Sequence, residues 1–323
     1  MRKFDVITIG GATADLFFEV DDYRLMREGG KKLLAFEYGT KVGVRETSSA
    51  FGGGAANAAV AFSRLGFRTA LVGAVGEDDR AERILKNLKN NKVDLRLIDK
   101  KKGEQSGVSF VLIGPDREHI VFTYRGANAS LKIDAREKKK LEQAHWLYLT
   151  SLSDSWKSTL STVFSSNCHI AWNPGREQLS AGKALLPFLK KTEVLLCNRA
   201  EALLLSVAFF GKKNTVPTQL LLKQLHSLGP RIVVITEGAK GARSFDGRSI
   251  CTQKSLLVSK PFNTTGVGDA FGSSFIAGLE ICKGDIQAAM KLGAINAAAV
   301  VKNHDAQAGL LSKSEAYARI TRS

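Results

Sequence analysis

The sequence predicts an α/β fold, a three-layer sandwich in which helices cover both faces of a mostly parallel central sheet, with a small β-sheet lid beside it. In the second half of the chain, strand-like apolar runs alternate with helix-like segments, which is the pattern of a covered parallel sheet. No internal repeat and no low-complexity linker divides the chain. We therefore expect residues 1–323 to form a single domain.

The main elements follow from hydrophobic periodicity and from the glycines and polar residues that end each run. Buried strands are expected over 4–9, 69–75, 146–150, 168–172, 194–197 and 231–236. Helices are expected over 55–65, 79–90, 159–164, 218–228, 270–282 and 286–302.

The lid is expected from two segments, about 15–46 and 104–125. In the second segment, strand-like runs at 108–113 and 119–124 are separated by Gly-Pro-Asp-Arg turn residues, which predicts a hairpin. The first segment is loop-rich, with alternating apolar residues in its later part. Together the two segments predict a small sheet outside the main layer.

The chain is basic, with 47 Lys and Arg against 31 Asp and Glu and a net charge of +16. Such a balance can attract nucleic acid, anionic membranes or phosphorylated ligands. The lysine runs at 100–102 and 138–140 are short and lack the interleaved aromatic residues of a base-stacking surface. No apolar stretch approaches the ~20 residues of a membrane span. We expect neither nucleic acid nor a membrane as a partner.

The four cysteines form no C-x-x-C pair and have no zinc-ligand spacing. Free thiols fit a reducing compartment, and the first residues lack the cleavage pattern of a signal peptide. These features favour a cytoplasmic protein.

Three consecutive glycines, Gly52, Gly53 and Gly54, precede the helix expected at 55–65. Glycines before a helix let a ligand approach the main-chain N–H groups, and the helix dipole adds partial positive charge. A flexible loop is the alternative. The glycines do not match the dinucleotide fingerprint, and the chain has no P-loop.

A second glycine-rich stretch leads into the long helix expected at 270–282, with Gly266, Val267 and Gly268 before Asp269. Consecutive N–H groups there are expected to form an anion nest at the positive helix end, which suits a transferring phosphoryl group. The Asp269 carboxylate can accept the proton of an attacking hydroxyl as a general base, or it can cap the helix.

The two stretches, in this order, resemble the two signatures of the PfkB, or ribokinase-like, family of carbohydrate and nucleoside kinases. The first signature matches Gly52-Gly53-x-x-x-Asn57 through Leu65-Gly66, and the second, usually D-T-x-G-A-G-D, matches 263–269. The resemblance covers roughly residues 4 to 310. It implies a ribokinase-like fold, ATP and Mg²⁺ as cofactors, and catalysis at Asp269 with Gly266, Val267 and Gly268.

On the acceptor side, the resemblance implies that Asp15 binds sugar hydroxyls at the lid edge. Asp15 follows a strand and a Gly-Gly turn, at the sheet edge where parallel sheets bind ligands, and a carboxylate can accept hydrogen bonds from two neighbouring hydroxyls. A solvated turn acid is the alternative. The other substrate-binding residues that the resemblance implies are Gly52, Gly53, Asn57 and Asn128.

On the nucleotide side, the resemblance implies that Asn198 and Glu201 are tied to phosphate and magnesium, and Glu201 can hold Mg²⁺ through water. It also implies a nucleotide-contacting turn with Thr236, Gly238 and Gly241, and Asn296 near the adenine. The alternatives are a helix cap, an ordinary tight turn and a polar residue on a helix face.

The chain departs from the family pattern at Asn263, where the family usually has an Asp that contributes to a monovalent-cation site. Asn keeps an oxygen ligand but loses the charge, so we predict weak or absent potassium activation. Thr13 stands where sugar-specific members often have Asn. The acceptor is therefore open among a ketose, a ribose derivative, a sugar acid and a nucleoside.

The expected function is ATP-dependent phosphorylation of a hydroxyl on a small sugar or sugar derivative. The alternatives are a nucleoside kinase of the same family and a non-catalytic ligand- or nucleic-acid-binding protein on this fold. Aromatic lid residues, Phe17, Phe18 and Phe36, can stack on a base, pack within the lid or lie at a homodimer interface through the lid.

Overall fold

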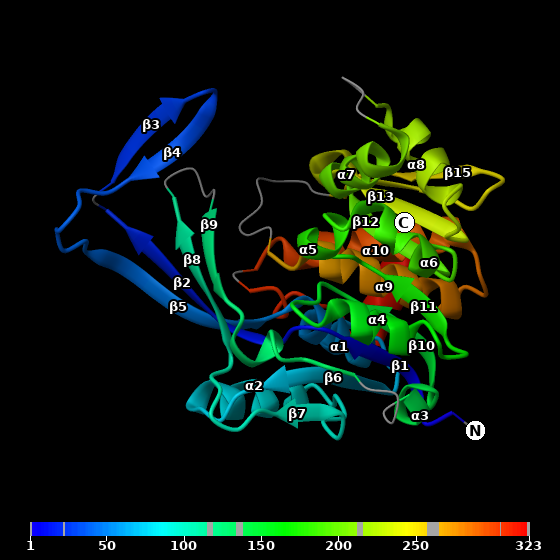
Figure 1. Ribbon diagram of the computed structural model, residues 1–323, viewed down its shortest axis with the longest axis horizontal. Helices are drawn as coiled ribbons and strands as arrows, with labels where there is room; N and C mark the ends of the chain where they lie inside the picture. The colour runs from blue at the N-terminus through cyan, green and yellow to red at the C-terminus, as the bar shows by residue number, and fades with distance from the viewer. Residues whose placement is uncertain are drawn as a thin grey trace.

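The structure is a computed structural model that describes residues 2–21, 23–114, 119–133, 138–211, 216–256, 265–303 and 305–321. Within these ranges the strands form a nine-stranded sheet, a four-stranded sheet and a two-stranded hairpin. Figure 1 shows the helices gathered around the large sheet, with the smaller sheets projecting to one side.

The central sheet is mostly parallel, as the alternating pattern predicts. Its order is β15 (Ile250–Gln253), β14 (Ala242–Phe245), β13 (Ile232–Thr236), β12 (Val194–Asn198), β11 (His169–Trp172), β10 (Ala144–Leu149), β1 (Phe4–Ile9), β6 (Thr69–Val75) and β7 (Ile98–Lys100). From β13 to β7 each neighbouring pair is parallel, whereas β14 and β15 add an antiparallel edge that was not predicted.

Helices cover both faces because the central strands are apolar on both sides. Along β1, Ile7 and Ile9 pack into one core cluster and Val6 into another. The first cluster joins α3 (Lys138–Leu141), α4 (Trp156–Val163), α5 (Arg176–Leu179), α6 (Leu186–Leu189), α7 (Arg199–Phe210) and α8 (Thr218–His226). The opposite face holds α1 (Gly54–Arg64), α2 (Asp79–Asn90), α9 (Val267–Ile281), α10 (Ile286–Val300) and α11 (Lys313–Thr321).

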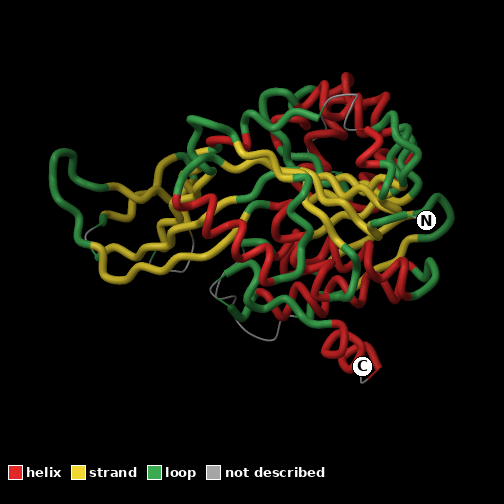
Figure 2. The backbone as a smooth tube through the Cα atoms, turned by 90° about the horizontal axis from the view of Figure 1, so that it is seen from below, coloured by secondary structure: helices red, strands yellow, loops and turns green. Residues whose placement is uncertain are grey.

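The four-stranded sheet has the order β5 (Val44–Gly52), β2 (Thr13–Val20), β8 (Gly107–Ile113) and β9 (His119–Tyr124). The predicted hairpin is confirmed, since β8 and β9 pair antiparallel, although its turn at 115–118 lies outside the described residues. The hairpin of β3 (Arg24–Glu28) and β4 (Lys31–Ala35) forms the separate two-stranded sheet. Figure 2 shows these strands extending well beyond the helical layers.

The description of 15–46 as loop-rich is wrong for β2, for the hairpin of β3 and β4 and for the start of β5. β2 is a continuous strand between β5 and β8, so Asp15 lies within a sheet and not in a solvated turn. Acidic side chains at Asp15 and Glu19 interrupt the apolar alternation that would have marked this strand.

The order of the central strands reverses at β1, because β6 lies on one side of it and β10 on the other. Ligands in open parallel sheets bind at the carboxyl ends of strands that flank such a switch point. At this switch point Gly10 follows β1 and Thr150 follows β10. A Cβ on Gly10 would lie 2.3 Å from the Thr150 hydroxyl, so the two chain segments meet closely here.

No helix in the described ranges is both long enough and apolar enough to cross a bilayer.

Candidate active site

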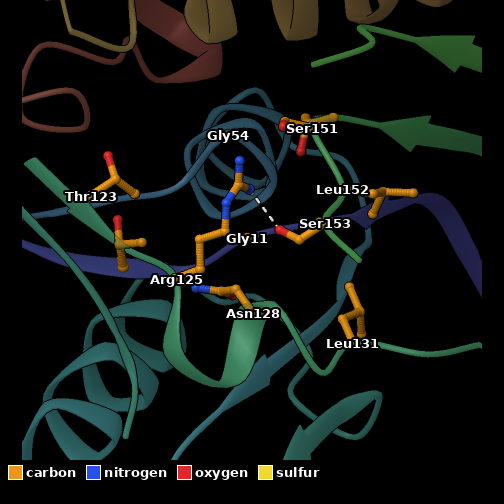
Figure 3. Close-up of a pocket in the computed structure, with 12 residues that line it drawn as sticks. Gly11, Gly54, Thr123, Arg125, Asn128, Leu131, Ser151, Leu152 and Ser153 are labelled. Atoms are coloured by element: carbon orange, nitrogen blue, oxygen red, sulfur yellow. Dashed lines mark hydrogen bonds between the residues drawn. The ribbon is translucent and has the colours of Figure 1, made fainter. Parts of the chain in front are cut away.

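A cavity of about 120 Å³ lies between the small sheet and the carboxyl ends of β1 and β10. Figure 3 shows it lined by Gly11, Gly54, Thr123, Arg125, Asn128, Leu131, Ser151, Leu152 and Ser153, and Gly10, Thr13 and Thr150 complete the lining. Most of these side chains are hydroxyls or short polar groups. Such a lining suits a small polyhydroxylated molecule.

Asp15 lies beside this cavity, on the small sheet. Its carboxylate accepts a hydrogen bond from the Thr13 hydroxyl at 2.9 Å, and only 5% of the residue is exposed. Burial raises the pKa of the Asp15 carboxyl, while hydrogen bonds from Ser109 and Thr13 oppose the shift. The carboxylate therefore lies in a largely dry setting, where an additional hydroxyl donor would be strongly bound.

The predicted glycine stretch lets β5 approach Asp15 closely. Gly52 ends β5, Gly53 has φ of 89° and precedes the helix, and Gly54 begins α1. A Cβ on Gly52 would lie 2.1 Å from Oδ2 of Asp15, a separation that no side chain can adopt. These glycines are therefore ordered parts of a strand-to-helix junction, and the flexible-loop alternative is wrong.

Asp269 lies in the first turn of α9 and faces α1. Asn57, in α1, donates a hydrogen bond from Nδ2 to Oδ2 of Asp269 at 2.9 Å. Oδ1 of Asp269 lies 3.2 Å from the position of a Cβ on Gly54, which also lines the cavity. The carboxylate thus lies next to a residue that lines the cavity, within reach of an acceptor hydroxyl bound there.

Burial raises the pKa of the Asp269 carboxyl to about 6, the bond from Asn57 opposes the shift, and repulsion from Glu201 adds to it. Asp269 is only partly buried. Neighbouring protein atoms displace much of the water around its carboxylate without enclosing it completely. A carboxyl group with a pKa near the working pH is suited to accept and release a proton.

The first turn of α9 is open. Gly266 is its N-cap in the left-handed conformation, with φ of 74°, and in the described residues no side chain caps the helix. Gly268 is exposed, and a Cβ there would meet nothing within 4 Å. The main-chain N–H groups near Val267 and Gly268 therefore lie at a positive helix end with room for an anion. Asp269 bonds Asn57 and does not cap the helix.

Asn198 and Glu201 form a capping box at the start of α7. The Asn198 side chain accepts from the N–H of Glu201 at 2.9 Å, and the Glu201 carboxylate accepts from the N–H of Asn198 at 2.8 Å. Both residues therefore cap α7, as the alternative expects, and their ties to phosphate and magnesium stay predictions. Burial raises the pKa of Glu201, and this carboxylate also raises the pKa of Asp269, so the two acids lie near enough to repel one another.

Thr236 ends β13 directly beside Asn198 at the end of β12. The turn that follows contains η3 (Gly238–Lys240) and then Gly241. Gly238 and Gly241 both have positive φ. Gly238 is open, whereas a Cβ on Gly241 would lie 2.1 Å from the Gln253 carbonyl. Of the predicted nucleotide-side residues, Asn198, Thr236, Gly238 and Gly241 thus lie together at one edge of the sheet.

Two predicted site residues have their side chains engaged elsewhere. The Asn128 amide, in η1 (Gly126–Asn128), both donates to and accepts from the main chain of Ala12. Asn296 is fully buried, donates to the Ser274 hydroxyl and accepts from the N–H of Leu311. The Asn296 side chain therefore lies in the core and has no exposed surface to offer a nucleotide.

Three residues near the site were not predicted: Arg125, Thr150 and Gln307. Arg125 and Thr150 line the cavity, and Gln307 donates to Oδ1 of Asn57 at 3.0 Å. None belongs to a glycine-rich motif, so only the fold reveals them. Asn263, the basis of the potassium prediction, lies outside the described residues, and that prediction stays untested.

No three His, Cys, Asp or Glu side chains gather into a metal-binding group within the described ranges. Mg²⁺ with a nucleotide needs only one or two carboxylates, because phosphate oxygens and water supply the other ligands. Glu201 and Asp269 repel one another, and a divalent cation would relieve this repulsion. The residues present therefore fit a magnesium–nucleotide complex held near Glu201.

The fold and this site define a ribokinase-like phosphotransferase that acts on an alcohol group. The family model for pfkB family carbohydrate kinases matches residues 26–313, so the chain belongs to the pfkB family. This confirms the family, the fold and the enzyme class predicted from the glycine motifs.

Relatives of the chain are similar over nearly their whole length. A 5-dehydro-2-deoxygluconokinase of Bacillus anthracis is 25% identical, covering 97% of this chain and 94% of the relative. An ATP-dependent 6-phosphofructokinase of Thermoanaerobacterium thermosaccharolyticum is 25% identical, covering 86% and 82%.

Solved structures show the same fold. The ribokinase of Thermotoga maritima superposes with a TM-score of 0.83 at 20% identity, covering 99% of this chain and 100% of that one. A nucleoside kinase of Methanocaldococcus jannaschii gives a TM-score of 0.78 at 21% identity, covering 99% of each chain.

Proposed function

We propose that the protein phosphorylates a hydroxyl of a small sugar or sugar derivative, with ATP and Mg²⁺ as cofactors and Asp269 as the general base. The observation that carries this proposal is the position of Asp269. Its carboxylate lies next to Gly54, which lines the cavity, and in the first turn of α9, which no side chain caps in the described residues, with its pKa raised to about 6.

In the proposed reaction, Asp15 accepts hydrogen bonds from the acceptor and fixes its orientation in the cavity. Asp269 takes the proton of one acceptor hydroxyl as its oxygen forms a bond to the terminal phosphorus of the nucleotide. Magnesium–ATP supplies the phosphoryl group, and ADP leaves. The N–H groups at the start of α9 stabilise the oxygens of the transferring group, whose charge persists through the reaction.

The nucleotide is proposed to lie along the edge that contains Asn198, Glu201, Thr236, Gly238 and Gly241. The relatives named for sugar kinases and the Arabidopsis thaliana ribokinase structure with ribose and ATP support a sugar and ATP as the substrates. The lid is proposed to be the small sheet, which borders the cavity through Thr13 and Thr123.

Asp269→Asn tests the proposal. Loss of a positioned base costs about 10²–10⁴ in rate, so turnover measured as ADP release should fall by that factor while ATP binding measured by calorimetry persists. Asp285→Asn is the matched control, because Asp285 caps α10 through the N–H of Ala288 and has no proposed catalytic role. Near-full activity of Asp269→Asn would overturn the assignment.

A nucleoside kinase is the second candidate, since solved structures of two nucleoside kinases have the same fold. A panel of sugars and nucleosides, followed by ADP release, separates the two. Turnover on nucleosides alone would replace the sugar with a nucleoside as acceptor. Salt-dependent binding of DNA or RNA without turnover on any acceptor would indicate a non-catalytic protein.

A further inference from the structure

We propose that a second cavity, at the amino ends of the central strands, binds a small organic phosphate through Arg248 and Lys283. The cavity has a volume of about 510 Å³. Its walls come from the starts of β10 and β11, the residues just before β12 and β13, the turn between β14 and β15, and the turn between α9 and α10. The inference goes beyond the proposed function, because it concerns a different site.

This cavity lies at the opposite edge of the sheet from the candidate active site. Trp146, near the start of β10, and Glu193, just before β12, line it, whereas Thr150 and Asn198 mark the carboxyl ends of the same two strands. α9 connects the two edges, with Asp269 in its first turn and the cavity residues Leu279 and Glu280 in its last. Ten residues of helix rise roughly 15 Å, so a ligand here is separate from the acceptor at Asp269.

Two cationic side chains of the lining are available to a ligand. Arg248 lies in the turn between β14 and β15, and Lys283 lies in the turn between α9 and α10. Both residues are exposed, and neither side chain forms an ion pair or a hydrogen bond with any residue that the structure describes. A guanidinium and an ammonium group carry donors only, so both need acceptors from outside the protein.

The lining holds as many carboxylates as Arg and Lys side chains, but the carboxylates are already engaged. Glu193 forms an ion pair with Arg231. The Asp246 carboxylate accepts two main-chain N–H groups of its own turn, at 2.9 and 2.8 Å, and Glu280 accepts from Nε1 of Trp146 at 2.6 Å. The groups left without partners are therefore positively charged donors, which select an anion. The net charge of +16 on the chain also favours the approach of anions.

The backbone at Lys283 gives a second, independent indication of a role for this side chain. Lys283 has φ of 53°, and Lys92 is the other residue with positive φ that is not a glycine in the described ranges. A side chain makes this left-handed conformation costly, whereas glycine adopts it freely. A lysine where the backbone favours glycine indicates that the side chain has a function.

The charge and size of the cavity favour a phosphate ester. A phosphate monoester carries roughly −1.5 to −2 charges at neutral pH, which balances two cations, whereas a carboxylate would leave one of them uncompensated. The volume is within the roughly 300–1,000 Å³ of small-molecule sites and exceeds what a phosphate ion alone would fill. Ile232, Leu279 and Ile286 offer carbon surface to an organic portion. A sugar phosphate and a nucleotide share this chemistry.

Tryptophan fluorescence can report binding at this cavity. Trp146 lines it, whereas Trp156 and Trp172 lie in the core cluster on the other face of the sheet. The full chain is titrated with a hexose phosphate, AMP and inorganic phosphate, and with the uncharged hexose and adenosine. At least one ester should change the fluorescence at concentrations where the uncharged compounds and inorganic phosphate do not, and Trp146→Phe should abolish the change. The ester that binds more tightly identifies the source of the phosphate.

The variants locate the phosphate. Arg248→Gln and Lys283→Gly should each weaken binding of the ester about 10-fold or more, because each loses a charged hydrogen bond. Lys92→Gly is the matched control, since it makes the same substitution at a positive φ outside the cavity, and it should bind as the wild type does. The thermal unfolding midpoint of Lys283→Gly should not fall, because glycine suits this conformation. Asp269→Asn should retain binding, which separates this site from the active site.

Unchanged affinity in both Arg248→Gln and Lys283→Gly would overturn the inference, as would the absence of any fluorescence change with either ester. A fluorescence change that persists in Trp146→Phe, or a loss of binding in Asp269→Asn as large as in Lys283→Gly, would assign the ligand to another site and also overturn it. Binding of inorganic phosphate as tight as that of the esters would exclude an organic phosphate as the ligand. Failure of the proposed kinase reaction would leave all of these results interpretable, because none of them requires turnover.

Discussion

Asn57 holds the Asp269 carboxylate from a neighbouring helix, with Nδ2 donating to Oδ2 at 2.9 Å. Asn57 is itself oriented, because Nε2 of Gln307 donates to its Oδ1 at 3.0 Å and Nδ2 of Asn87 donates to Oε1 of Gln307 at 2.8 Å. With its oxygen bound to Gln307, Asn57 must present its N–H₂ to the carboxylate. This chain of amides links α2 and the segment before α11 to the proposed base.

The first prediction concerns the pH dependence of the reaction. Asp269 must be ionised to accept a proton, so kcat/KM should rise with pH and level off above an apparent pKa of about 6. Asn57→Ala removes the bond that lowers this pKa, and the acidic limb of the profile should move to higher pH. A profile that is flat from about pH 5 to pH 8 would contradict the role of Asp269.

The second prediction concerns Gln307 as a positioning residue. Gln307→Leu removes the donor that orients Asn57, so kcat should fall about 10-fold and the acidic limb should shift as in Asn57→Ala, with KM for ATP unchanged. Gln224→Leu is the matched control, because it breaks a comparable bond from Ser206 outside the site. If both variants change the pH profile alike, Gln307 has no positioning role.

The third prediction concerns stability. The pKa of Asp269 is raised in the folded protein, so its contribution is complete below the ordinary pKa near 3.8 and is lost as pH rises through about 6. The side chain in Asp269→Asn cannot ionise. We therefore expect the free energy of unfolding of this variant at pH 8 to exceed that of the wild type by on the order of 1–2 kcal/mol, a figure reduced for the partial exposure of the residue. Urea unfolding at about pH 8 and pH 4 measures this, and an advantage of equal size at both would contradict the assignment.

The fourth prediction concerns the contact between Gly52 and Asp15. Gly52→Ala places a methyl group within 2.1 Å of the carboxylate in the unrelaxed structure, so Asp15 must move. KM for the acceptor should rise roughly 10- to 100-fold while ATP binding is retained. Gly43→Ala, just before β5 begins, serves as the control, since its Cβ would meet nothing within 4 Å.

The fifth prediction concerns pairing of two chains through the lid. Leu16, Phe110 and Phe122 are direct neighbours across β2, β8 and β9, and they are 37%, 39% and 54% exposed. An exposed apolar row of this kind marks an interaction surface. Phe122→Glu should convert a dimer to a monomer in light scattering, whereas Val121→Glu, on the opposite face of β9, should not. A monomeric wild-type protein would refute the pairing.

Local pattern was sufficient for much of the fold. β6 and α2 have the predicted bounds, because neighbouring residues mark where each element begins and ends. The apolar run of β6 is bounded by polar residues, and α2 is capped by Asp78. The antiparallel edge of β14 and β15 was missed because these strands are short and only partly buried. Their identity as strands depends on β13 beside them.

Residues of the candidate site could be predicted from the sequence only where they belong to a recognisable motif. Glycines at 52–54 and at 266 pointed to the surroundings of Asp15 and Asp269, because close main-chain approach or positive φ requires glycine there, whereas Gly268 has neither constraint. The bond between Asn57 and Asp269 joins residues far apart in the sequence, and Gln307 and Arg125 have no local pattern. Asn296 was misplaced because a polar residue on a helix looks alike whether it lines a cleft or bonds within the core.

β2 has a consequence for how such a protein can change during evolution or engineering. One uninterrupted strand carries both Asp15, at the cavity, and the outer residues that pair with β5 and β8. The part that recognises the acceptor and the part that covers it are therefore a single piece of backbone. A lid transplanted from another kinase would bring its own acceptor preference with it, and a graft that keeps the old preference would have to join within β2.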